Sequence, residues 1–266
     1  MSSDHKKQNG INEYPGFNSL QNPGKTKCEI NCDMGEGAGN DELIMPFIHA
    51  VNIACGYHAG DPDTMWRTAE LALKHNVSIG AHVSFPDRNN FGRSEMNMAE
   101  EEVYELIIQQ LMILKEIVTG LDAKIRHVKP HGALYNMSAR DASLAKSIAR
   151  AVKDFDPAFI LFGLSGSHSI QEAKKIGLAT SSEVFADRTY REDGTLTPRT
   201  QPNALIETTE KVIQQVLQML NEGTVTTVSG KIIPIAAETI CIHGDGQHAL
   251  EFAKAIRKSI QNELND

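Results

Sequence analysis

The chain has 266 residues, of which 41% are hydrophobic and 23% are charged, and its formal net charge is −8. This composition is typical of a globular protein, and the acidic balance argues against nucleic-acid binding, which needs a basic stripe. The 4 cysteines are too few for a secreted disulfide scaffold, and no apolar run reaches the roughly 18 residues of a membrane span.

The first part of the chain differs from the rest. Residues 1–27 are polar and rich in Asn, Gly, Ser and Lys, without the apolar stretch of a signal peptide. We therefore expect 1–27 to be a flexible polar tail, residues 28–266 to be the folded part, and the protein to be cytoplasmic.

Short apolar runs alternate with amphipathic stretches from Cys28 onward. The apolar runs predict strands over 28–33, 50–55, 77–82, 124–130, 159–163, 181–186 and 239–243. The amphipathic stretches predict helices over 61–75, 97–120, from 138 onward, over 202–221 and over 247–263. Residues 224–236 alternate around Ser229-Gly230, which predicts a hairpin before the last strand.

Strands that are mostly followed by helices predict a parallel sheet, either open or closed. An open sheet gathers its functional loops at one switch point, whereas a barrel draws them from the ends of most strands. Polar residues lie at the ends of six of the seven predicted strands, namely Asp33 with Glu36, His58, His82, Lys129 with His131, Glu183 with Asp187 and Arg188, and His243 with Asp245. This distribution favours a single closed α/β barrel, a (β/α) catalytic domain.

Histidine and carboxylate side chains are the usual acids and bases near pH 7, and they also bind divalent metals. Either use leads to hydrolysis or proton transfer. The candidate catalytic residues are Asp33, Glu36, His58, His82, His131, His243 and Asp245. If a divalent metal is bound, which the sequence leaves open, Asp33, His58 and His82 are the candidate ligands. His127 precedes His131 on the same strand face, so we expect it deeper in the barrel and in a packing role.

Three cations, Lys129, Arg188 and Arg199, either form surface ion pairs or hold a carboxylate or phosphate at the barrel mouth. Two glycine-containing segments fail as nucleotide-binding loops. Gly24-Lys25-Thr26 lacks the first glycine and the preceding strand of a P-loop. Gly35 to Gly39 lacks the last glycine of a dinucleotide motif and places Glu36 against the pyrophosphate. We therefore expect no ATP site within this chain.

At these residues the sequence resembles the LamB/YcsF family, described as the A component of 5-oxoprolinase. The matching segments are INCDMGEG (30–37), NIACGYHAGDP (52–62), IGAH (79–82), VKPHGALYN (128–136), EVFADRTY (183–190), the L-x-P-R of 196–199 and ICIHGD (240–245). The chain departs from the family pattern at Val83, usually proline, and at Asn90 and Ser94 of the Gly-Phe-Gly-Arg-Arg motif. For that reason Arg93 is left out of the candidate site.

The resemblance implies a seven-stranded barrel related to the glycoside hydrolase/deacetylase group. It also implies ATP-dependent opening of 5-oxoproline to L-glutamate, together with B and C partner subunits that would bind the co-substrate ATP. The motifs mark as substrate-binding candidates Asn31, Asn52, Lys129, Glu183, Asp187, Arg188 and Arg199.

Two other functions remain open. One is a metal-dependent deacetylase or amidohydrolase that acts without ATP, and the other is a non-catalytic carrier of a lactam. The sequence also leaves the oligomeric state open, homo-oligomers included.

Overall fold

The computed structural model describes residues 28–244, 246 and 248–265, so the expected tail and Asp245 lie outside the described residues. Parallel strands form one closed barrel in the order β1-β2-β3-β4-β5-β6-β9, with β9 pairing with β1. The strands are β1 (Glu29–Met34), β2 (Ala50–Ala54), β3 (Ser78–Val83), β4 (Ile125–Pro130), β5 (Ile160–Leu164), β6 (Ala179–Phe185) and β9 (Thr239–His243). The predicted seven-stranded barrel is therefore confirmed.

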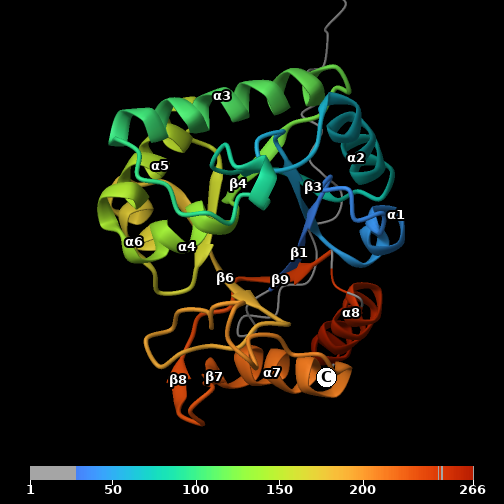
Figure 1. Ribbon diagram of the computed structural model, residues 1–266. Helices are drawn as coiled ribbons and strands as arrows, with labels where there is room; N and C mark the ends of the chain where they lie inside the picture. The colour runs from blue at the N-terminus through green and yellow to red at the C-terminus, as the bar shows by residue number, and fades with distance from the viewer. Residues whose placement is uncertain (1–27, 245, 247, 266) are drawn as a thin grey trace, which may run out of the picture.

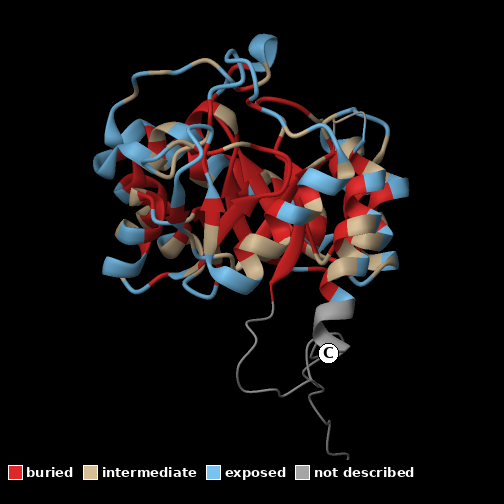
Figure 2. Ribbon diagram, turned by 90° about the horizontal axis from the view of Figure 1, so that it is seen from below, coloured by how far each residue is buried: buried red, intermediate tan, exposed pale blue. Residues whose placement is uncertain are grey.

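Helices surround the barrel (Figure 1) and cover its strands, which are buried in the centre of the molecule (Figure 2). They are α1 (Asp41–Ile44), α2 (Pro62–Lys74), α3 (Glu100–Thr119), α4 (Gly132–Arg140), α5 (Ala142–Phe155), α6 (His168–Lys175), α7 (Thr209–Glu222) and α8 (Ala249–Asn265), with short 3-10 turns at Met45–Phe47 and Arg88–Asn90. Among the described residues, none of these helices is long and apolar enough to cross a membrane.

The predicted start of α2 and the predicted hairpin are both present. Asp61 caps α2, since its carboxylate accepts the backbone N–H of Thr64 at 2.7 Å and Pro62 occupies the first helical position. The predicted hairpin is also present, because β7 (Thr224–Thr226) pairs antiparallel with β8 (Ile232–Pro234). It leaves the barrel between α7 and β9, as the alternation around Gly230 indicates.

Three predicted helix starts are wrong. The helix expected from residue 97 begins at Glu100, where the Glu102 carboxylate accepts the Ala99 N–H at 2.7 Å. The helix expected from residue 138 begins at Ala142, because Asp141 accepts the N–H groups of the first turn. The helix expected from residue 202 begins at Thr209.

The late start of α7 has a structural reason. The preceding residues form a long excursion held by the isolated bridges Arg188–Leu205 and Tyr190–Leu196. This excursion returns the chain to the mouth of the barrel, where it forms one wall of the cavity described below.

The barrel interior contains His127, fully buried and stacked on Phe162 with ring centroids 4.1 Å apart. Its Nε2 lies 2.7 Å from Oδ1 of Asn52. On the adjacent strand, a Cβ added to Gly80 would lie 2.0 Å from that same Nε2. His127 thus packs inside the barrel, as predicted, and the position beside it requires glycine.

We predict that Gly80→Ala lowers the free energy of unfolding by about 1–3 kcal/mol, the usual cost of overpacking a core. Urea denaturation measures this cost. If the His127 ring is the cause, Gly80→Ala should cost less in a His127→Ala background than in the natural protein. Equal costs in the two backgrounds would contradict this explanation.

Candidate active site

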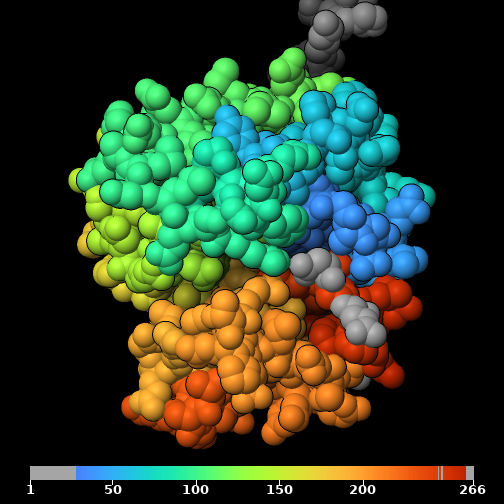
Figure 3. All heavy atoms as spheres, in the orientation of Figure 1, coloured from blue at the N-terminus to red at the C-terminus, as the bar shows by residue number. Residues whose placement is uncertain are grey.

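A cavity of about 510 Å³ opens at the carboxyl ends of the barrel strands. One wall consists of residues 91–95 and 130–140, and the opposite wall of the excursion between β6 and α7. Figure 3 shows these two parts, green above and orange below, packed against each other. The candidate residues that line the cavity are Asp33, Glu36, His82, Lys129, His131, Arg188, Arg199 and His243.

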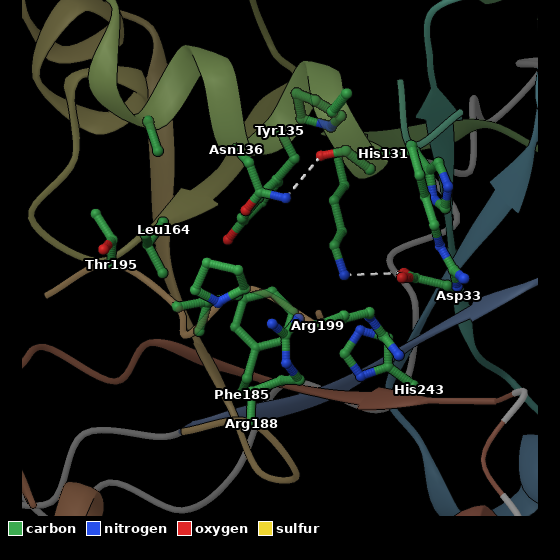
Figure 4. Close-up of a pocket in the computed structure, with 18 of the residues that line it drawn as sticks. Asp33, His131, Tyr135, Asn136, Leu164, Phe185, Arg188, Thr195, Arg199 and His243 are labelled. Atoms are coloured by element: carbon green, nitrogen blue, oxygen red, sulfur yellow. Dashed lines mark hydrogen bonds and ion pairs between the residues drawn. The ribbon is translucent and has the colours of Figure 1, made fainter. Parts of the chain in front are cut away.

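At the cavity floor, Lys129 is 2% exposed and forms ion pairs with two carboxylates. Its Nζ lies 2.8 Å from Oδ1 of Asp33 and 2.8 Å from Oε1 of Glu183 (Figure 4 shows the first). Asn31 donates to Glu183 at 2.9 Å, and Asn52 donates to Asp33 at 2.8 Å. Asn31, Asn52 and Glu183 are fully buried and lie below the cavity lining, where they fix Lys129 and Asp33.

Asp33 and Lys129 are both held in their charged forms. Burial alone would raise the pKa of Asp33, but the neighbouring His82 imidazole and Lys129 ammonium hold it well below its usual range. Burial alone would lower the pKa of Lys129, but the negative charge of Asp33, with Cys241 and Glu183, raises it well above its usual value. The cavity floor therefore presents an ionised carboxylate at neutral pH.

Four side chains on one side of the cavity form a compact group, here called the histidine–glutamate cluster: Glu36, His58, His82 and His131. Oε1 of Glu36 lies 3.0 Å from Nε2 of His58, 3.5 Å from Nδ1 of His131 and 3.7 Å from Nε2 of His82. The three imidazoles are nearly or fully buried. Burial lowers the pKa of His131 to about 3 and that of His58 as well, which favours neutral rings.

Across the cavity, His243 forms a second pair with Asp187. Nδ1 of His243 lies 2.9 Å from each carboxylate oxygen of Asp187, and the ring stacks on Phe185. Burial would raise the pKa of Asp187, but His243 and the arginines Arg199 and Arg188 lower it. An ionised Asp187 accepts the Nδ1–H of His243, so Nε2 is left as the nitrogen for proton exchange.

Two candidate arginines, Arg188 and Arg199, contribute positive charge to the same cavity, which Arg93, Arg140 and Arg191 also line. Arg188 is buried, and its guanidinium donates to the carbonyl oxygens of Thr197 at 2.6 Å and Ala204 at 3.3 Å. Arg199 is exposed. Burial, and then repulsion from Arg199, lowers the pKa of Arg188 to about 10. An anion bound between the two guanidinium groups would relieve this repulsion.

The loop after β3 completes the histidine–glutamate cluster, and the candidate residues did not include it. The Phe91 carbonyl accepts from Nε2 of His131 at 2.9 Å. A Cβ added to Gly92 would lie 2.8 Å from the His131 ring and 2.9 Å from Cβ of His58. Asp87 holds the loop through Asn90 and Ser94, two of the three positions that depart from the family pattern. Arg93 lines the cavity.

The structure brings the candidates together as two groups, the histidine–glutamate cluster and the His243–Asp187 pair. Asp33 and Lys129 lie between these two groups and join them. His58 and Asp187 lie behind the lining and contact it through Glu36 and His243. One ligand atom from each of Asp33, Cys241 and His243 also falls within 4.8 Å of the others. Asp245 lies outside the described residues.

Comparisons with known proteins show the family of this chain. A family model described as the LamB/YcsF family matches residues 28–265. A relative from Brevibacillus brevis, named as the A component of 5-oxoprolinase, is 51% identical over 237 residues, covering 87% of this chain and 93% of its own length. A relative of the same name from Bacillus thuringiensis subsp. konkukian is 48% identical and covers 89% and 96%.

A solved structure is similar over nearly the same extent. The crystal structure of a lactam utilization protein from Thermus thermophilus superimposes with a TM-score of 0.83 at 39% sequence identity, covering 89% of this chain and 97% of the other. Because the family match spans the described fold and the relatives align over almost their whole length, this chain belongs to the LamB/YcsF family.

Proposed function

We propose that this chain is one component of a hydrolase that opens 5-oxoproline to L-glutamate at the expense of ATP, together with B and C partner subunits. The names of its relatives support the substrate and a complex of several components. The observation that carries the proposal is one cavity in which an ionised carboxylate, buried imidazoles and several arginines, Arg188 and Arg199 among them, converge. That combination suits hydrolysis of an anionic, activated amide.

The reaction needs activation because an unstrained five-membered lactam is a poor electrophile. In the proposed sequence the partner subunits transfer the γ-phosphoryl group of ATP to the lactam carbonyl oxygen and release ADP. Water then adds to the ring carbon, and the C–N bond breaks as the ring nitrogen gains a proton, which leaves an acyl phosphate. A second water molecule cleaves that acyl phosphate to glutamate and inorganic phosphate.

Each candidate residue of this chain has a role in this reaction that follows from its position in the cavity. Asp33, fixed through Oδ1 by Lys129 and Asn52, takes the proton of the attacking water. His82 and His131 position that water. His243, oriented by Asp187 and protonated on both nitrogens for this step, delivers its Nε2 proton to the departing nitrogen and is left neutral. Arg188 and Arg199 bind the substrate carboxylate or the phosphate.

The sequence suggested that Lys129 binds a substrate carboxylate or phosphate, but we propose a different role for it. Its ammonium is surrounded by Asp33, Glu183 and Cys241. We therefore propose that it positions Asp33, while the two arginines carry the anion-binding role.

Omitting ATP tests the proposal against its main alternative. With the partners present, glutamate release from 5-oxoproline should require both ATP and this chain. A metal-dependent amidohydrolase, an alternative that the histidine–glutamate cluster favours, would release product from this chain without ATP or partners. A non-catalytic lactam carrier would bind 5-oxoproline in calorimetry while the assembled enzyme tolerated loss of the histidines.

Gly92→Ala tests the role of the loop after β3. Gly92 has φ +65, and an added Cβ would lie 2.8 Å from the His131 ring and 2.9 Å from Cβ of His58. The methyl group should therefore displace the rings and lower kcat about 10²-fold, the scale of a roughly 1 Å misplacement. The matched control is Gly230→Ala, with φ +84 and nothing within 4 Å of the added Cβ. Glutamate formation should fall only in the first variant, and similar losses in both would exclude the contact as the cause.

A further inference from the structure

The histidine–glutamate cluster contains an electrostatic conflict when its imidazoles are neutral. Nδ1 of His82 lies 3.0 Å from the carbonyl oxygen of Lys129, and Nε2 of His131 lies 2.9 Å from the carbonyl oxygen of Phe91. A carbonyl oxygen only accepts hydrogen bonds, so each of these nitrogens carries a hydrogen. In a neutral imidazole the other nitrogen then carries a lone pair.

Those two remaining nitrogens face each other. Nε2 of His82 and Nδ1 of His131 are 2.9 Å apart, and Oε1 of Glu36 lies 3.7 Å and 3.5 Å from them. While both rings are neutral, two lone pairs and a carboxylate oxygen converge on a buried point and repel one another, and a proton or a metal cation between them removes this repulsion. The separations suit one ion, because ligand atoms bound at about 2.0–2.2 Å stand at most about 4 Å apart.

We infer that Glu36, His82 and His131 bind a divalent transition-metal ion of the zinc class. Imidazole nitrogen and carboxylate oxygen together are ligands of this class. The hydrogen bonds from the opposite ring nitrogens to the Lys129 and Phe91 carbonyls are those that orient metal-binding histidines in proteins. An ion here supplies Lewis acidity beside Asp33, whose Oδ2 lies 3.3 Å from Nε2 of His82.

His58 has a different part in this site. Its ring stacks on His131 with centroids 3.8 Å apart and planes inclined by only 7°. A nitrogen lone pair lies in the plane of its ring, so two parallel stacked rings cannot direct lone pairs at the same point. We therefore assign His58 as a positioning residue that holds Glu36 through Nε2 at 3.0 Å.

The inference deepens the proposed function, and its catalytic meaning rests on that function, but metal binding is measured on this chain alone. The tag-free full-length chain, stripped with chelator, is titrated with Zn²⁺ by calorimetry and with Co²⁺ by visible absorption. We expect about one ion per chain, with Co²⁺ bands typical of nitrogen and oxygen ligands in a low-symmetry site. Failure of both ions to bind would overturn the inference and leave the ATP-dependent reaction untouched.

Variants locate the ion. His131→Ala and Glu36→Gln should abolish or strongly weaken Zn²⁺ binding while circular dichroism stays unchanged, and His58→Ala should weaken it about 10–100-fold, as loss of an orienting residue does. His243→Gln is the matched control. His243 belongs, with Asp33 and Cys241, to a separate set of side chains that could hold a metal ion. Zn²⁺ binding lost in His243→Gln but retained in Glu36→Gln and His131→Ala would place the ion in that other set and refute the assignment.

Discussion

Replacing His131 by alanine is expected to lower glutamate formation by the assembled enzyme about 10²–10⁴-fold, the usual contribution of a well-placed catalytic group. His131 is 8% exposed, lines the cavity, and lies within 3.5 Å of both His82 and Glu36. Its removal breaks the histidine–glutamate cluster while the strands beneath keep their contacts. The measurement is kcat for glutamate release from 5-oxoproline and ATP, with thermal unfolding recorded on the same sample.

His75→Gln is the matched histidine control for that experiment. His75 follows α2 and precedes β3, so it lies at the end of the barrel opposite the cavity. It should retain activity and unfolding temperature. Near-normal turnover in His131→Ala would remove His131 from the catalytic group, whereas a large fall in unfolding temperature would show that its loss acts through the fold.

Lys129→Ala should destabilise the fold by about 3–5 kcal/mol, the cost of removing one partner from a buried ion pair. The ammonium is 2% exposed and lies 2.8 Å from both Asp33 and Glu183, so its removal leaves two carboxylates buried without their cation. The change in the free energy of unfolding, measured by urea denaturation, checks this value.

An exposed lysine pair provides the comparison. Lys231 pairs with Glu192 at 3.2 Å, but both side chains are more than half exposed. Lys231→Ala should therefore cost only about 0–1 kcal/mol. Similar decreases in the free energy of unfolding for the two variants would contradict the assignment of Lys129 to the structural centre of the barrel.

The strands and their closure into a barrel were predictable because each strand is a short apolar run with, in most cases, a polar residue at its carboxyl end. That pattern placed Asp33, His82 and His243 at one opening, and the structure agrees. Helix starts were harder to predict because capping residues compete locally. Ser138 precedes Asp141 at capping spacing, yet only Asp141 caps a helix, while Ser138 lies inside α4.

The internal organisation of the site was not predictable from residue types. Asp33, His58 and His82 were the metal candidates, but His82 contacts His131 at 2.9 Å and His58 contacts Glu36 at 3.0 Å. These pairings depend on backbone atoms, namely the carbonyls of Lys129 and Phe91, which carry no residue-specific signal. Gly92 and Gly132 offered the best available signal, since both adopt positive φ values where the loop after β3 meets α4.

The burial of Asn31, Asn52 and Glu183 likewise depends on strand register. Their place in the motifs marked them as substrate-binding, but alternation along β1, β2 and β6 directs them into the barrel below the cavity. There they hydrogen-bond to Asp33, Lys129 and one another. Contact of these three side chains with substrate stays a prediction.

In the proposed reaction this chain carries the ring-opening step while its partners handle ATP. The most direct measurement is glutamate and ADP formed from 5-oxoproline and ATP by the B and C subunits, with this chain added, omitted or replaced by His131→Ala. We expect glutamate only when the unaltered chain is present. Equal glutamate formation by the B and C subunits in its absence would contradict this division of the reaction.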